Sequence, residues 1–194
     1  MKTAGIALMM VAAAATAVAG KTPEEARHLT ICMVSPPDSD AIVNGAKAVA
    51  SGIFAGIGVK IQWRGQGKCP AEALYVSFSI ETPVNQLPGA LAYALPFEGT
   101  HIVVFLDRVK TVLAPSAVPF LLGYTLAHEI THILEGQARH SASGIMKAQW
   151  EAADYFEMRQ GRLGFADVDV SLIYHAGWNG GNRMRSCSGV DRMS

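Results

Sequence analysis

A long apolar segment near the middle of the chain, residues 120–135, carries His128-Glu129-x-x-His132 in its second half. The segment is apolar nearly all round up to Thr125, and Pro119 suits the first turn of a helix, so the sequence predicts a buried helix. Residues four apart on a helix lie on the same face, and the two imidazoles can therefore reach one metal ion. Gly136 fits the left-handed residue that commonly ends a helix, where the chain can turn sharply.

The residue types at this spacing indicate zinc chemistry. A catalytic zinc ion takes three protein ligands and keeps one position open for water. His128 and His132 supply two ligands, and Glu129 is placed to act on the water without being a ligand, as in zinc peptidases. The alternative is a pair of ordinary histidines on a buried helix. We favour a metal site with Zn²⁺ as the cofactor, because further ligand candidates lie nearby in the chain.

Two residues are candidates for the third ligand. His140 follows the predicted helix end, where the chain could swing its imidazole back toward the metal. Glu151 follows His132 with eighteen residues between them, which is the spacing of some gluzincin peptidases. In that arrangement Asp154, on the same face of the following helix, could orient a ligating histidine.

The segment from His128 to Met146 resembles the metzincins, and within them the matrixin-like, compact bacterial form. Their signature is HExxHxxGxxH followed by a Met-turn, and residues 143–146, Ser-Gly-Ile-Met, match that turn. The resemblance implies that His140 is the third ligand and that Met146 forms an apolar floor beneath the metal. The chain departs from the family in one respect. Seven residues, 133–139, separate the second and third histidines, where the family has five.

Hydrophobic periodicity predicts an α+β fold, and the order of its predicted elements resembles that of metzincin catalytic domains. We expect a twisted mixed sheet of about five strands packed on two long helices, followed by a mostly helical C-terminal part. The predicted strands are 28–34, 59–63, 74–80, 90–95 and 101–106, and the predicted helices are 41–55, 120–135, 147–160 and 167–174.

The resemblance also implies where a substrate would bind. In the family, a peptide lies extended beside the edge strand above the cleft, and main-chain pairing of this kind is a general recognition mode. The matching segment here contains Ala90, Leu91 and Ala92, which we therefore predict to bind substrate; an ordinary edge strand is the alternative. Tyr155 and Tyr174 could each stabilise the oxyanion, and the sequence does not choose between them.

The N-terminus is typical of a secretory signal peptide. Lys2 precedes an apolar run, residues 4–18, and small residues then offer a cleavage site before Gly20. The run is short and alanine-rich for a membrane anchor. We therefore predict a signal peptide over residues 1–19, a catalytic domain over 20–174, a flexible Gly/Arg-rich tail over 175–194, and a secreted or periplasmic protein without a stable membrane anchor after cleavage.

Export also permits disulfides. The cysteines are Cys32, Cys69 and Cys187, an odd number, so the sequence allows one bridge with a free thiol or no bridge at all.

Together these features predict an exported zinc-dependent endopeptidase with Glu129 as its general base and a peptide or protein as its partner. The 16 basic and 16 acidic residues balance, so no nucleic-acid partner is expected. A hypothesis from another class is a secreted zinc-binding protein without turnover. Glu129 argues against it, because a purely structural site has no use for a carboxylate beside an open water position.

Overall fold

The computed structural model describes residues 27–65, 67, 69–95, 100–175, 178–179 and 182–183. The segment 1–19 and most of the segment 175–194 lie outside these residues, so the signal peptide and the flexible tail stay predictions. The strands are β1 (Arg27–Met33), β2 (Val59–Arg64), β3 (Leu74–Ser79), β4 (Ala92–Ala94), β5 (His101–Phe105), β6 (Trp178–Asn179) and β7 (Asn182–Arg183). The helices are α1 (Asp40–Ala55), α2 (Leu106–Val112), the short 3₁₀ turn η1 (Pro115–Ala117), α3 (Val118–Glu135), α4 (Ala152–Arg159) and α5 (Asp167–His175).

The main sheet has five strands in the order β2-β1-β3-β5-β4. The first four are parallel to one another, and β4 pairs antiparallel with β5 at the edge. The continuous apolar run of β5 suits a strand inside such a sheet, because it packs against neighbours on both faces. The predicted mixed sheet and the α+β fold class are confirmed.

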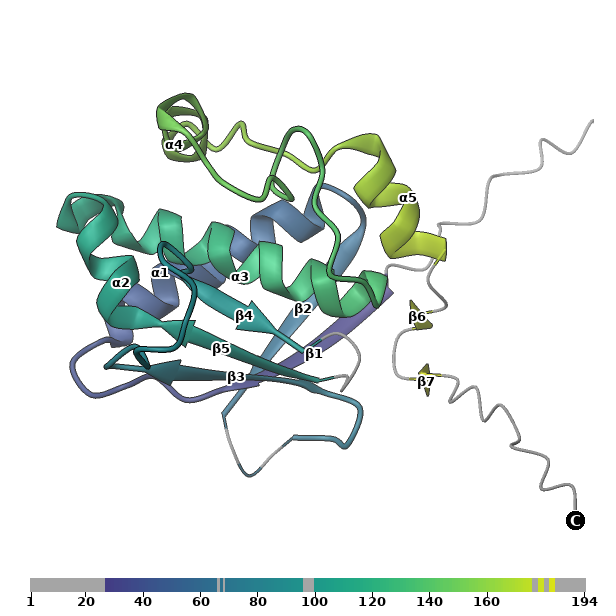
Figure 1. Cartoon of the computed structure of the whole chain (residues 1–194). Helices are drawn as coiled ribbons and strands as arrows, with labels where there is room; N and C mark the ends of the chain where they lie inside the picture. The colour runs from purple at the N-terminus through teal and green to yellow at the C-terminus, as the bar shows by residue number, and fades with distance from the viewer. Residues whose placement is uncertain are drawn as a thin grey trace, which may run out of the picture.

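The two long helices, α1 and α3, lie side by side over one face of the sheet (Figure 1). Small residues allow their close approach: a Cβ added to Gly123 would lie 2.6 Å from the Cβ of Val49. The interface and the inner face of the sheet form one hydrophobic core. No single helix among the described residues has the length and hydropathy of a membrane span, and the α2–α3 pair that passes this test jointly is bent by 119°.

Three elements depart clearly from the predictions. The helix α2 was not predicted; it starts directly after β5 and is too short for periodicity to reveal it, although Leu106 and Val109 are buried three residues apart. The helix predicted over 147–160 was wrong in its first part, because α4 begins only at Ala152. Its start is fixed by Asp154, whose carboxylate accepts the backbone N–H of Glu151 at 2.8 Å. The predicted edge strand shortens to the three residues of β4.

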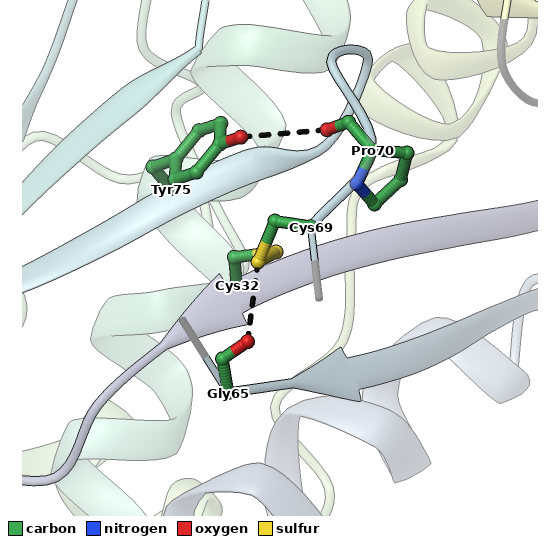
Figure 2. The surroundings of a disulfide bond; sticks show 5 residues. All are labelled: Cys32, Gly65, Cys69, Pro70 and Tyr75. Atoms are coloured by element: carbon green, nitrogen blue, oxygen red, sulfur yellow. Dashed lines mark hydrogen bonds between the residues drawn. A yellow bond between two sulfur atoms is a disulfide. The ribbon is translucent and has the colours of Figure 1, made fainter. Parts of the chain in front are cut away.

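A disulfide joins Cys32, near the end of β1, to Cys69, in the loop that precedes β3 (Figure 2). The structure thus selects the alternative with a bridge, while Cys187 lies outside the described residues. The bridge closes a sequence separation of 37 residues and ties the loop after β2 to β1, an inner strand of the sheet.

Candidate metal centre

The second half of α3 places three candidate functional side chains together. His128, Glu129 and His132 are 8%, 8% and 7% exposed, and the Nε2 atoms of the two histidines are 3.0 Å apart. This arrangement follows from the sequence, because the i,i+4 spacing brings both rings to the same face of a regular helix.

Backbone carbonyls determine which ring nitrogens carry protons. The Nδ1 atom of His128 is 2.8 Å from the carbonyl of Ile145, and that of His132 is 3.1 Å from the carbonyl of Gln137. A carbonyl can only accept, so each Nδ1–H is the donor in these bonds and each neutral ring has an unprotonated Nε2. The two Nε2 lone pairs then face each other with no proton to share, which is the arrangement that a metal cation fits.

His140 completes the cluster. Its ring centroid is 5.3 Å from that of His128 and 5.0 Å from that of His132, and one ligand atom from each ring lies within 4.8 Å of the other two. Gly136, with φ of 65°, ends α3 and lets the longer connection turn back. Within the described part of the chain, this is the only group of three or more His, Cys, Asp or Glu side chains that converges in this way.

Glu151 does not join the histidines. Its side chain is 78% exposed at the start of α4, 3.6 Å from the Nζ atom of Lys147. Asp154, which could have oriented a ligating histidine, instead accepts a hydrogen bond from the same Nζ at 2.6 Å. The structure therefore brings His140 to the cluster and holds Glu151 in an exposed ion pair with Lys147.

The Met-turn segment, residues 143–146, contacts the histidine cluster and is held in place by its own backbone hydrogen bonds. Ile145 and Met146 are both fully buried, and the backbone N–H of Ser141 donates to the carbonyl of Met146 at 2.7 Å. Gly144 has φ of 75° and lies against the backbone of Gly164. The carbonyl of Ile145 also accepts a hydrogen bond from the His128 ring. This bond connects the turn directly to α3 at the histidine cluster.

Burial sets the protonation of the histidines. Desolvation lowers the pKa of His128 to about 3 and that of His132 to about 4, and it also lowers the pKa of His140. All three rings are therefore neutral at physiological pH, which is the form that ligates a metal.

Glu129 shows the opposite shift. Burial raises its pKa to about 8, and the hydrogen bond from the backbone N–H of Ala94 only partly opposes this effect. A buried carboxylate ionises readily only beside a positive charge. The donor set and the elevated pKa thus both fit a cation held by the three histidines.

A cleft of about 640 Å³ opens in front of the cluster. Residues 87–94, including Ala90, Leu91 and Ala92, line it together with the α3 side chains. Of the two tyrosines considered from the sequence, Tyr155 lines the cleft. The hydroxyl of Tyr174 instead donates a hydrogen bond to the carbonyl of Ile57, and Tyr174 does not line the cleft.

Sequence reasoning missed Trp150 and Lys147, which also line the cleft. The indole of Trp150 lies edge-on to His128, with centroids 5.6 Å apart, and its Nε1–H donates to the carbonyl of Ile145 at 3.1 Å. The only signal was their nearness in sequence to Met146. The sequence predicted a helix over this segment, whereas residues 147–151 are irregular in the structure. The prediction therefore did not indicate that these two side chains reach the cleft.

Comparison with models of known protein families gives no match, and comparison with curated protein sequences gives none either. The structure is similar to the crystal structure of archaemetzincin from Methanopyrus kandleri, with a TM-score of 0.53. The match covers 80% of this chain and 98% of that one, at 15% sequence identity. The chain has a metzincin-like fold. At this identity the likeness concerns the fold, and it confirms the fold that the segment from His128 to Met146 predicted.

Proposed function

We propose that this protein is an exported zinc-dependent endopeptidase. The observation that supports it best is the convergence of three neutral histidines beside a buried glutamate, in a cleft bordered by an edge strand. His128, His132 and His140 would hold the zinc ion. When bound there, zinc supplies Lewis acidity, which polarises the scissile carbonyl and lowers the pKa of water.

Glu129 is the proposed general base. Its carboxylate takes a proton from the attacking water and returns it to the leaving amine, the two transfers that peptide hydrolysis needs. Burial raises the pKa of Glu129 in the metal-free chain, and the positive charge of a bound cation would favour the ionised carboxylate that the base requires. Tyr155 is the tyrosine that lines the cleft, and its hydroxyl is the proposed hydrogen-bond donor to the oxyanion.

The substrate would lie extended along β4. The carbonyl of Leu91 accepts the N–H of Phe105 at 2.8 Å, so Leu91 faces β5, and the carbonyl of Ala90 accepts a hydrogen bond from Arg108 at 2.9 Å. Alternate residues of an antiparallel strand direct their main-chain groups to opposite sides. Of the three residues predicted from the sequence, Ala92 is thus the one whose main chain we assign to substrate pairing.

The test compares wild type with Glu129→Gln in the same two assays, zinc content and hydrolysis of an unbiased peptide library. Zinc should be retained, and cleavage should fall by about 10²–10⁴-fold, the usual contribution of general acid–base catalysis. A wild type that binds zinc stoichiometrically but cleaves no peptide would instead establish the zinc-binding protein without turnover.

The ligand set is tested with a matched pair of variants. His140→Ala should lose zinc during dialysis against a chelator, whereas Glu151→Ala should keep it, because Glu151 is exposed and does not belong to the histidine cluster. The reverse result would assign the third ligand to Glu151.

Export is tested separately: the mature protein should be found outside the cytoplasm with Gly20 as its first residue, and a full-length protein retained inside the cell would contradict it.

A further inference from the structure

His140 is the least constrained of the three histidines by its own segment of chain. It is exposed, it lies outside regular secondary structure, and it follows a connection two residues longer than the family pattern. Helical spacing therefore cannot position it. Something else in the structure must hold this part of the connection in place.

Both neighbours of His140 contact the same carboxylate oxygen. The Nη2 atom of Arg139 is 2.6 Å from Oδ1 of Asp169, and the hydroxyl of Ser141 donates to that oxygen as well. Arg139 also donates from Nη1 to the hydroxyl of Ser141 at 2.9 Å. The three side chains form a closed set of hydrogen bonds that spans His140.

Asp169 is a fixed point for this set. It lies on α5, is fully buried, and accepts the backbone N–H of Ala166 through its second oxygen at 3.1 Å. The helix α5 packs against α3, which carries the other two histidines. A buried carboxylate that is hydrogen-bonded through both oxygens, on a helix packed against α3, has little freedom to move. It can therefore hold the connection that carries His140 in a fixed position relative to α3.

We propose that Asp169 is a positioning residue of the metal site, which holds Arg139 and Ser141 and thereby directs His140 toward the other two histidines. The proposal rests on the proposed function, because it assumes that His140 is a metal ligand. Without these contacts, metal binding would have to order the connection at the cost of its conformational entropy. Groups that orient a metal ligand typically change the metal affinity by about 10–100-fold.

The experiment measures the zinc dissociation constant of purified full-length protein by competition with a chromogenic chelator. Asp169→Asn should weaken zinc binding by about 10–100-fold. The visible spectrum of the cobalt-loaded variant should shift toward that of His140→Ala, because the ligand set then loses His140. Ser141→Ala and Arg139→Gln each remove one arm and should give smaller losses in the same direction. Neither side chain is fully buried, so these two variants test the proposal even if Asp169→Asn does not fold.

Asp107→Asn is the matched control. The Asp107 carboxylate also holds a loop, accepting hydrogen bonds from the backbone N–H of Thr82 at 3.0 Å and from its hydroxyl at 2.7 Å, but Asp107 does not line the histidine cleft. Its zinc affinity should equal that of wild type. If Asp169→Asn, Ser141→Ala and Arg139→Gln fold and bind zinc within about twofold of wild type, with an unchanged cobalt spectrum, Asp169 serves stability alone and the proposal is wrong. A wild type without zinc affinity, or a His140→Ala variant that binds as tightly as wild type, would instead overturn the proposed function.

Discussion

Two segments of the candidate metal centre are built in different ways. The helix α3 delivers His128, Glu129 and His132 through regular spacing in a buried element. The connection from residue 137 to residue 151 delivers His140 through an irregular path held by contacts with distant parts of the chain. In the first segment a side chain's position follows from its number along the helix. In the second it depends on tertiary contacts, so the effect of a mutation there should depend on which of these contacts it removes.

The largest difference between the segments should appear at two left-handed glycines. A Cβ at Gly144, in the connection, would lie 2.5 Å from the backbone oxygen of Gly164, whereas a Cβ at Gly136, at the end of α3, would have nothing within 4 Å. Gly144→Ala combines left-handed strain with a backbone clash and should cost about 3 kcal/mol or more. Gly136→Ala carries the strain alone, about 1–2 kcal/mol. Urea unfolding measures both, and equal costs would show that the connection yields as easily as the helix end.

The junction between the segments should respond to pH. Burial raises the pKa of Glu135, the last residue of α3, to about 7 from an ordinary value of 4.5, with Arg139 partly opposing the shift. The folded chain thus holds this proton more tightly than the unfolded chain. The resulting stabilisation is complete below pH 4.5 and is lost as the pH rises through 7.

The side chain in the variant Glu135→Gln stays neutral at every pH. The variant therefore tests the predicted direction of this pH dependence of stability. Relative to wild type, the metal-free variant should gain on the order of 3 kcal/mol in unfolding free energy between pH 5 and pH 8. Urea unfolding at the two pH values, with chelator present, gives the difference. A variant whose stability relative to wild type is the same at both would mean that Glu135 ionises normally in the fold.

The smallest expected effect lies within the helical segment, at its contact with α1. A Cβ at Gly123 would lie 2.6 Å from the Cβ of Val49, whereas one at Gly52 on α1 would meet nothing within 4 Å. Gly123→Ala should cost about 1–3 kcal/mol through overpacking. Gly52→Ala should stabilise by about 0.5–1 kcal/mol, because alanine favours the helix. Thermal unfolding separates the two signs, and a stabilising Gly123→Ala would show that the helices can move apart freely.

Several features were predictable because they depend on local pattern. The strands, α1 and α3 follow from hydrophobic periodicity, and most observed boundaries lie within two residues of the predicted ones. The start of α4 was not predictable in this way. Residues 147–151 have a helix-compatible composition, but Trp150 donates to Ile145 and Lys147 pairs with Asp154, so tertiary contacts override local preference there.

The sequence alone determined that His128 and His132 share one face of a buried helix, with Glu129 next to the first of them, since α-helical geometry fixes the relation between residues four apart. Only the tertiary structure decided that His140, and not Glu151, meets them, and that Tyr155, and not Tyr174, lines the cleft. It also paired Cys32 with Cys69. The physical reason is the same in each case. These relations depend on where separate elements pack, and Asp169 lies 30 residues from Arg139 in sequence but at hydrogen-bonding distance in the fold.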